Sequence, residues 1–134
     1  GHIFFADKWY GFDDGIYTSL RLLEILTNNE PSDILESLPK SITTPEINIP
    51  FDGSEHITFM RSFVKKTKFI DAKIVDIDGL KVIYDDSWGL IRCSNTTSSI
   101  VLRFEADDNK AMENIKKIFK QSMLSIDNTM IIPF

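Results

Sequence analysis

Apolar and polar residues alternate along much of residues 40–134, as they do in half-buried strands. Short polar turns separate these runs. Asp78-Gly79 lies between two of them and is a strong hairpin signal, because a two-residue turn needs positive φ. The pattern predicts an antiparallel sheet of four to five strands. The predicted strands are residues 46–49, 72–77, 80–84, 88–92 and 100–104.

Two stretches of residues 40–134 instead repeat their apolar positions every three to four residues, which is typical of helices. Ser54 is the predicted N-cap of the first helix and Asp107 of the second, because both side chains accept hydrogen bonds from free amides of the first turn. The order β-α-β-β-β-β-α predicts an α+β fold with both helices on one face of the sheet. The expected buried positions are Ile57, Met60, Phe63, Val64 and Thr67 in the first helix, and Ala111, Ile115, Ile118 and Phe119 in the second.

Residues 1–39 have a different character. Residues 3–5 are predicted to form a strand, and residues 32–38 one short turn of helix. Between them, Asp13 or Asp14 is expected to cap a helix that ends at Asn28-Asn29. One strand and one or two helices cannot bury their own apolar faces, so this region is interpreted as the strand-helix tail of an α/β domain whose sheet lies upstream. The apolar stripe of its helix consists of Ile16, Leu20, Leu23 and Leu26.

The charge balance argues against one large class of partner. With 15 basic and 20 acidic residues the net charge is −5, and the basic face that nucleic-acid binding requires is not visible. The one dense basic cluster, residues 65–68, lies at a predicted helix end, where positive charge complements the helix dipole. No apolar run approaches the roughly 20 residues that span a bilayer. We expect neither nucleic acid nor membrane as a partner, a cytoplasmic location, and packing roles for Trp9, Tyr10 and Trp88.

Cysteine and histidine are too few to build a metal site. Cys93 is the only cysteine, which excludes an intrachain disulfide and a multi-thiolate zinc site, and His2 and His56 lie far apart. Asp76 and Asp78 superficially resemble an acidic metal loop, but magnesium requires several converging carboxylates, and a hairpin turn is the better interpretation. We predict no metal ligand in this chain, a solvated His56, and a Cys93 packed in the sheet.

The polar loop between the last two predicted strands is the best candidate for a ligand site. Residues 92–99 supply a guanidinium, several hydroxyl groups and an amide. A phosphate dianion binds to such a set, through a planar fork, hydroxyl and amide donors, and the backbone N–H groups of a turn. On composition alone an ordinary polar turn is the more common explanation. The same loop contains a glycosylation sequon, which we interpret as coincidental.

Three stretches carry a family resemblance that runs from the first residue to the last. They are Gly1-His2-Ile3-Phe4-Phe5 with Gly11-Phe12-Asp13-Asp14-Gly15; Thr43-Thr44-Pro45-Glu46-Ile47-Asn48-Ile49; and Trp88-Gly89-Leu90-Ile91-Arg92-Cys93-Ser94-Asn95-Thr96-Thr97 followed by Leu102-Arg103-Phe104-Glu105-Ala106. Together they resemble the α-D-phosphohexomutases, and the Ser-Asn-Thr loop resembles the bacterial phosphomannomutase/phosphoglucomutase branch. Members usually have proline where this chain has Ser98, a change that removes a rigid turn but no donor.

The resemblance implies the C-terminal piece of a four-domain enzyme. Residues 1–39 would be the end of the sugar-binding third domain with its hinge. Residues 40–134 would be the TATA-binding-protein-like fourth domain, which grips the phosphate that is not being transferred. The implied phosphate ligands are Arg92, Ser94, Asn95, Thr96 and Thr97. His2 matches a histidine that is an acid/base candidate in such enzymes.

The parent enzyme implied by the resemblance interconverts the 1- and 6-phosphates of mannose or glucose, through a phosphoserine and a bisphosphorylated sugar. It uses Mg²⁺ and a hexose 1,6-bisphosphate activator, and its partners here would be the hexose phosphate and the upstream domains. Neither a phosphoserine loop nor a metal loop is recognisable in these 134 residues. We therefore expect the chain alone to lack mutase activity.

Two other interpretations stay open at this point. One is a stand-alone module, without catalysis, that binds a small anion or has a regulatory role. The other is RNA binding on an open sheet, which requires exposed aromatic residues on central strands and a basic surround. The change of character near residue 40, with Pro39 and Pro45 close by, also predicts a hinge at residues 41–45.

Overall fold

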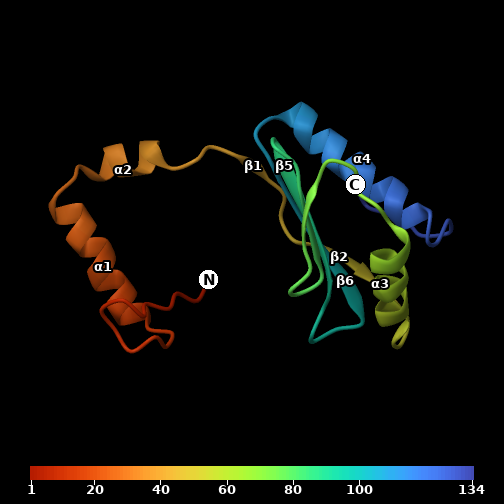
Figure 1. The fold of residues 1–134 in the computed structure, drawn as a ribbon, viewed down its shortest axis with the longest axis horizontal. Coiled ribbons are helices and arrows are strands. Elements are labelled where there is room, and N and C mark those ends of the chain that lie inside the picture. The colour runs from red at the N-terminus through yellow and green to blue at the C-terminus, as the bar shows by residue number, and fades with distance from the viewer. The chain divides into compact units, whose positions relative to one another are not determined.

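The computed structural model describes residues 1–134, which divide into two compact units, Gly1–Pro39 and Lys40–Phe134. The first unit contains two helices, and the second contains a sheet with two helices (Figure 1). The second unit thus has the predicted α+β fold.

The sheet of the second unit has six strands, all antiparallel to their neighbours. They are β1 (Ile42–Thr43), β2 (Ile47–Pro50), β3 (Lys73–Val75), β4 (Leu80–Ile83), β5 (Ser87–Cys93) and β6 (Ser99–Ala106). Their order is β1-β6-β5-β4-β3, and β2 pairs with β6 as well. The two longest strands, β5 and β6, pair along seven positions. The sequence did not predict β1, because two residues are too short for alternation to be visible.

Two helices, α3 (Glu55–Lys66) and α4 (Asn109–Leu124), cover one face of this sheet (Figure 1). The fully buried ring of Phe119 on α4 meets Phe104 of β6 edge-on, with ring centroids 5.1 Å apart. Gly89 of β5 leaves room for that contact, because a Cβ at this position would lie 2.5 Å from the Phe119 ring. The fully buried side chains are Val82, Ile91, Ile100, Leu102, Phe104, Ile115, Phe119 and Met123, together with Phe63 of α3.

The starts of these helices differ from prediction in two details. Asp108, one residue after the predicted Asp107, caps α4, and its carboxylate accepts a 2.8 Å hydrogen bond from the amide of Ala111. The amide of Asp107 instead donates to the carbonyl of Asp86, across the turn that precedes β5. Ser54 stands at the N-cap position of α3, but its hydroxyl makes no capping hydrogen bond.

The helix α3 faces the core with a side rotated from the predicted one. Ile57 and Val64, expected inside, are 40% and 45% exposed. His56, expected to be solvated, is only 8% exposed. The physical reason is aromatic packing, since the helix turns its phenylalanine rings into a cluster that reaches α4, and large rings bury more apolar area than Ile or Val. The buried residues of α3 are His56, Phe59, Met60 and Phe63.

The segment that follows Pro39, which contains the hinge predicted at residues 41–45, pairs in part with the sheet of the second unit. Ile42 and Thr43 pair with β6. Thr44 donates its amide to the carbonyl of Phe104, and its hydroxyl accepts from the Phe104 amide, both at 3.0 Å. These residues therefore belong to the second unit, and the boundary between the two compact units lies at Pro39 and Lys40.

The first unit is built on α1 (Gly15–Thr27) and α2 (Pro31–Ser37). Asp14 caps α1 as predicted, accepting a 2.9 Å hydrogen bond from the amide of Tyr17. The strand predicted at residues 3–5 is wrong. It reduces to one bridge between Phe4 and Asp13, because no neighbouring strand extends the pairing.

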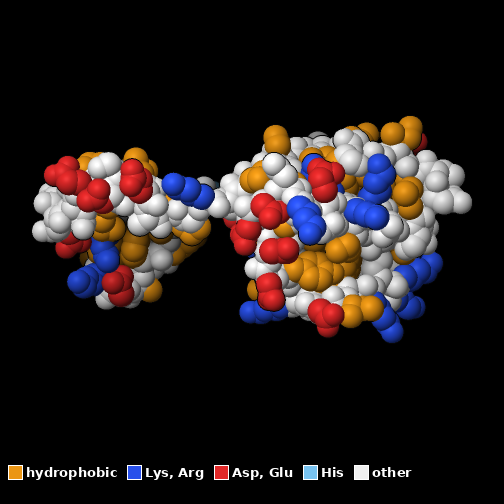
Figure 2. All heavy atoms as spheres, turned by 90° about the horizontal axis from the view of Figure 1, so that it is seen from above, with side chains coloured by type: hydrophobic (Ala, Val, Ile, Leu, Met, Phe, Trp, Pro, Cys, Tyr) orange, Lys and Arg blue, Asp and Glu red, His pale blue; other side chains and the backbone are white.

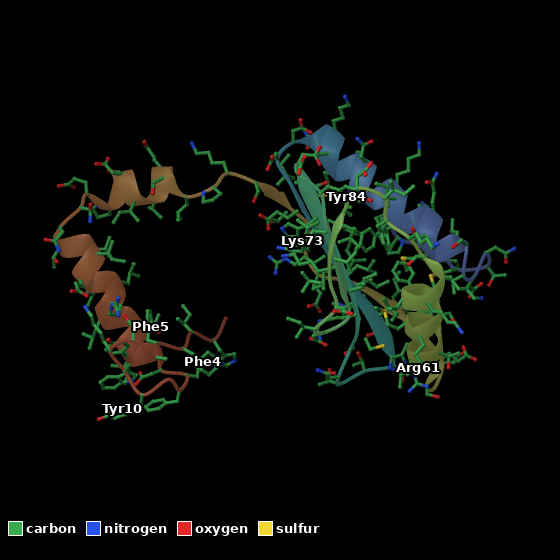
Figure 3. The ribbon with its side chains drawn as sticks, viewed as in Figure 1. Phe4, Phe5, Tyr10, Arg61, Lys73 and Tyr84 are labelled. Atoms are coloured by element: carbon green, nitrogen blue, oxygen red, sulfur yellow. The ribbon has the colours of Figure 1, made fainter.

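Apolar side chains of the first unit reach its surface (Figure 2). No residue of α1 or α2 is buried, and Ile16 and Leu20 of the predicted stripe are 79% and 57% exposed. The aromatic residues gather at the start of α1, where Figure 3 labels Phe4, Phe5 and Tyr10. The helix of this unit is therefore supported by its cap and by a few aromatic contacts, without a core.

Candidate functional site

The candidate loop is the connection between the two central strands of the second unit. Cys93 at the end of β5 pairs with Ile100 of β6, and Ser94 donates its amide to the carbonyl of Ser99 at 2.9 Å. Residues 95–98 are exposed, while Ser99 is buried beneath them. The longest strand pairing in the sheet thus holds both ends of the loop, and the polar tip of the loop is left in solvent.

Inside the loop, several donors converge on the hydroxyl oxygen of Ser94. The amides of Thr96 and Thr97 donate to Ser94 Oγ at 3.3 and 3.2 Å, and the Thr97 hydroxyl donates to it at 2.9 Å. The Thr97 hydroxyl also lies 2.8 Å from the hydroxyl of Ser99. Two successive backbone N–H groups directed at one oxygen form an anion-binding concavity. The two amide contacts are longer than the usual 2.9–3.0 Å, so a neutral hydroxyl fills this position weakly.

Arg92 lies at the base of the loop, on the face of the sheet that the helices leave open. Its side chain is 28% exposed, and its Nη1 lies 3.8 Å from Oδ2 of Asp78, in the turn between β3 and β4. That distance is an ion pair without a hydrogen bond. The guanidinium is thus close to the loop along the chain, and its donors remain available to a ligand.

The open face is basic although the chain as a whole is acidic. The strand register puts Lys73, Lys81, Arg92 and Arg103 on this face, and Figure 3 labels Lys73 on the side away from the helices. Trp88 of β5 lies there too, with the ammonium of Lys81 3.8 Å from its ring centroid. This cation covers the ring, which agrees with the predicted packing role for Trp88 rather than with base stacking.

Cys93 and His56 lie next to each other but do not form a catalytic pair. Cys93 is partly buried in the sheet, as predicted, and its thiol contacts the carbonyl oxygen of His56 at 3.7 Å. Burial, and secondarily the negative charge of Asp78, raises the pKa of the Cys93 thiol, which disfavours the nucleophilic thiolate. The buried Nδ1 of His56 has no hydrogen-bond partner. Neither residue has the environment of a nucleophile or its base.

His2, the acid/base candidate, belongs to the first unit. Its Nδ1 pairs with a carboxylate oxygen of Asp13, and the bridge between Phe4 and Asp13 holds the two segments together. The side chain of His2 is 81% exposed. This pairing orients the imidazole and leaves Nε2 facing away from the carboxylate. Sequence reasoning did not identify Asp13 as the partner of His2, and treated it only as a possible cap or a turn residue.

Metal ligands do not gather anywhere in residues 1–134. No group of three or more His, Cys, Asp or Glu side chains is placed to hold an ion. The residues of this chain therefore do not fit the Mg²⁺ that the family resemblance implies for the parent enzyme, and no step through magnesium belongs to them.

None of the helices has the length and apolar character needed to cross a membrane.

A groove of about 590 Å³ lies on the second unit, away from Arg92. It runs between β2 with the residues that follow it and the chain after α4. Its lining combines apolar side chains with the carboxylates of Asp52, Glu55 and Asp127. No sequence pattern predicts this groove, because its two walls are about 75 residues apart in the chain. Negative charge makes it unsuited to phosphate.

An antiparallel sheet backed by two helices defines an α+β domain, and the donor-rich loop between its central strands is its candidate ligand site. Residues 46–122 match the model of the family "Phosphoglucomutase/phosphomannomutase, C-terminal domain", and the chain belongs to this family. The resemblance to the phosphohexomutases seen in the sequence is confirmed.

Individual relatives give the same result over the whole chain. The chain is 39% identical over 136 residues to "Phosphomannomutase/phosphoglucomutase" of Pseudomonas aeruginosa, and the alignment covers 100% of the chain and 29% of that protein. It is 49% identical over 123 residues to "Phosphoglucomutase" of Neisseria gonorrhoeae, covering 90% of the chain and 27% of that protein. A solved phosphoglucomutase/phosphomannomutase family protein from Burkholderia thailandensis superimposes with a TM-score of 0.88 at 42% identity, over 100% of the chain and 28% of that structure. The chain thus spans less than a third of these relatives.

Proposed function

We propose that this chain is the C-terminal part of a phosphomannomutase/phosphoglucomutase, and that its loop at residues 92–97 binds the phosphate group of a hexose phosphate. The supporting observation is the convergence of the Thr96 and Thr97 amides on one oxygen, in a loop that starts directly after β5 and Arg92. Hydrogen bonds to an anionic oxygen are roughly twice as strong as those between neutral groups. A phosphate oxygen therefore replaces the Ser94 hydroxyl as the acceptor of these two amides.

Each residue of the loop has a distinct role in this proposal. Arg92 offers two parallel N–H donors, which match two phosphate oxygens. Ser94, released as an acceptor, turns its hydroxyl proton toward the ligand. Asn95 and Thr96 are exposed and contribute an NH₂ group and a hydroxyl. Thr97 contributes its backbone amide, while its hydroxyl continues to contact Ser99.

The complete enzyme supplies the chemistry in this proposal. Upstream domains would hold a phosphoserine and Mg²⁺, which would supply phosphoryl transfer and charge stabilisation there, and a hexose 1,6-bisphosphate would serve as activator. The second unit of this chain holds the phosphate that is not transferred, and His2 of the first unit is the acid/base candidate. The chain alone has neither the phosphoserine loop nor a metal site, so we propose that it is inactive by itself. A cytoplasmic location belongs to the same proposal.

Motion between the two units is part of the proposed mechanism. Because residues 41–44 are bonded to β6, the hinge is assigned to residues 38–40, just before these contacts begin. Rotation there would carry the loop toward a bound sugar phosphate. Closure of this kind adds donors to the phosphate and excludes water, and both effects favour phosphoryl transfer.

The test is an amide NMR titration of the chain with mannose 1-phosphate. A few charge-assisted hydrogen bonds of about 1.5–3 kcal/mol each, less several kcal/mol for association, give a dissociation constant of roughly 1 mM. We expect saturable shifts at residues 92–97 that Arg92→Ala abolishes. Arg103→Ala is the matched control, because it removes the same charge from the same face outside the loop. No saturable shifts at tens of millimolar would contradict the proposal.

Inorganic phosphate provides a second arm of the same experiment. If the loop recognises only the phosphate group, inorganic phosphate and mannose 1-phosphate will bind to the isolated chain with affinities within about threefold of each other, since no sugar contact contributes a further hydrogen bond. A strong preference for the sugar phosphate would show that this chain also reads the sugar. Equal effects of Arg92→Ala and Arg103→Ala would show that the basic face attracts anions without a specific loop.

A further inference from the structure

The turn between β3 and β4 lies directly against the base of the candidate loop. Leu80 pairs with Ile91, which puts Gly79 beside Arg92 on the neighbouring strand. The approach is so close that a Cβ on Gly79 would lie 2.3 Å from the Ile91 carbonyl oxygen and 2.5 Å from Cβ of Arg92. Gly79 also has φ of +83°, a conformation that residues with a side chain rarely adopt. Only glycine fits here, and its absence of a side chain determines how near the turn comes to Arg92.

Asp78, the preceding residue, points negative charge at the same guanidinium. Its Oδ2 lies 3.8 Å from Nη1 of Arg92, and its side chain is 72% exposed. Being exposed, the carboxylate is free to move away when another anion arrives. A phosphate bound by Arg92 would meet this like charge within a few ångströms, and like charges at such distances repel measurably even beside water.

We propose that this turn, Asp78-Gly79, belongs to the anion site and controls both the position of Arg92 and the affinity for phosphate. Gly79 sets the position of Arg92 by its close approach. Asp78 is a counter-charge that occupies the guanidinium in the free chain and competes with the bound phosphate, so that the affinity is lower than the donors alone would give. This inference rests on the proposed function, and it adds two positioning residues that lie outside the loop and are separated from it by more than ten positions in the sequence.

The arrangement suits a site that must bind and release the same group repeatedly. Arg92 is never left without an anion, because Asp78 replaces the phosphate as it leaves. The guanidinium therefore stays on the open face between binding events, and it loses little side-chain freedom when the next phosphate binds. The counter-charge of Asp78 thus lowers the affinity for phosphate and also keeps the Arg92 side chain in position. An uncharged neighbour would do neither.

Asp78→Asn tests the counter-charge, with inorganic phosphate as the probe and NMR titration of the full 134-residue chain as the readout. Removing an exposed charge partner is expected to tighten phosphate binding roughly two- to fivefold, the range that corresponds to exposed ion pairs. Asp76→Asn is the matched control, because Asp76 is exposed in the same turn, carries the same charge and belongs to no ion pair. We expect it to leave the affinity within about 1.5-fold of the unmodified chain. Unchanged or weaker binding in Asp78→Asn, or equal tightening in both variants, would overturn the counter-charge.

Gly79→Ala tests the positioning role. The added methyl group must displace Arg92 or the Ile91 carbonyl, so we expect phosphate affinity to fall at least about fivefold, approaching the loss caused by Arg92→Ala. Gly53→Ala is the control, because Gly53 also has positive φ, at +50°, but has no atom within 4 Å of the added carbon. Gly53→Ala therefore also puts a side chain at a positive-φ position, but without the collision. Unchanged affinity in Gly79→Ala would overturn the positioning role, and so would an equal loss in Gly53→Ala.

The outcomes separate this inference from the proposed function. If the unmodified chain binds phosphate at residues 92–97 and neither turn variant changes the affinity, the proposed function of the loop is supported and the proposed role of the turn is contradicted. If the unmodified chain does not bind phosphate at all, both fail together. Amide spectra that keep the dispersion of the unmodified chain outside the β3–β4 turn show that each variant is folded, which keeps a weakened affinity interpretable.

Discussion

The helices α1 and α4 show how the same kind of pattern leads to different results in the two units. Both are amphipathic, both begin at an aspartate cap, and both were predicted from apolar residues at helical spacing. Five residues of α4 are buried, because the sheet of the second unit covers its apolar face. No residue of α1 is buried within this chain. An amphipathic pattern thus indicates that a helix has an apolar face suited to burial. Whether other residues of this chain bury that face depends on the fold.

This difference predicts that the two units unfold separately. Helical stability in proteins comes mainly from packing of the apolar face and much less from helix propensity. Each unit has one tryptophan, Trp9 in the first and Trp88 in the second, so the variants Trp88→Phe and Trp9→Phe allow each unit to be followed by fluorescence. The four comparisons below use these reporters or local hydrogen exchange, and run from the largest expected effect to the smallest.

Loss of a core ring is expected to have the largest effect. Phe119→Ala removes a fully buried ring from the second unit and should lower its unfolding free energy by about 3–5 kcal/mol. Leu20→Ala, at a 57% exposed position of α1, should change stability by less than about 0.5 kcal/mol. Denaturant unfolding of the Trp9→Phe background measures the first and of the Trp88→Phe background the second. A comparable loss for Leu20→Ala would show that α1 is packed against something within this chain.

One substitution, glycine to alanine, should have opposite signs in the two units. Gly89→Ala would place a methyl group 2.5 Å from the ring of Phe119, and overpacking of this kind costs about 1–3 kcal/mol. Gly15→Ala, at the start of α1, meets no atom within 4 Å and should stabilise that helix by about 0.5 kcal/mol. Denaturant midpoints measure the first change, and amide exchange within α1 the second. Stabilisation by Gly89→Ala would mean that the sheet and α4 are less tightly packed than the structure shows.

The two aspartate caps provide a matched pair with nearly identical geometry. Asp108 accepts from the amide of Ala111 at 2.8 Å, and Asp14 from the amide of Tyr17 at 2.9 Å. Replacement of either by alanine should cost about 1 kcal/mol. In Asp108→Ala the loss should appear in the global unfolding of the second unit, because α4 unfolds with the sheet. In Asp14→Ala it should appear only as faster amide exchange in α1. A global change from Asp14→Ala would show that the two units are coupled.

Much of the fold of the second unit follows from local pattern, since alternation located five of its six strands and the helix spacing located α3 and α4. The errors arise where a partner decides the result. Residues 3–5 alternate too little and find no neighbouring strand, and β1 is defined only by its pairing with β6. The buried face of α3 includes His56, because the side of the helix that carries Phe59 and Phe63 is turned toward the core. Composition contains no such information.

The candidate site divides in the same way. The donors of residues 92–97 could be predicted because they are contiguous in sequence, and a polar loop between strands is a local feature. The ion pair between Asp78 and Arg92 could not be predicted, because the place of Asp78 beside Arg92 depends on the register between β4 and β5. The basic open face also depends on register, since Lys81 and Arg103 are separated by more than twenty residues in the sequence. Properties that depend on which residues face each other across strands require the structure.

Acid titration is expected to give the smallest effect, and it again compares the units. Hydrogen bonds lower the pKa of Asp14, chiefly the one from the Tyr17 amide, and lower the pKa of Asp127, chiefly those from Thr129. A carboxyl group with a lowered pKa in the folded state contributes stability above its ordinary pKa of about 3.9. That stability is lost as the pH falls from this value through the lowered pKa.

Protonation of Asp14 should therefore accelerate amide exchange at the start of α1 below about pH 4. Protonation of Asp127 should loosen only the turn after α4 that Thr129 closes, while the sheet stays intact. Both effects are measured as the amide exchange rates of the two segments, followed by NMR between roughly pH 5 and pH 2, a range set by the ordinary aspartate pKa of about 3.9. The variants Asp14→Asn and Asp127→Asn are controls, because they cannot titrate. If α1 does not respond, Asp14 is not the group that holds its first turn. If the sheet responds with Asp127, the C-terminal segment stabilises the second unit more than its hydrogen bonds indicate.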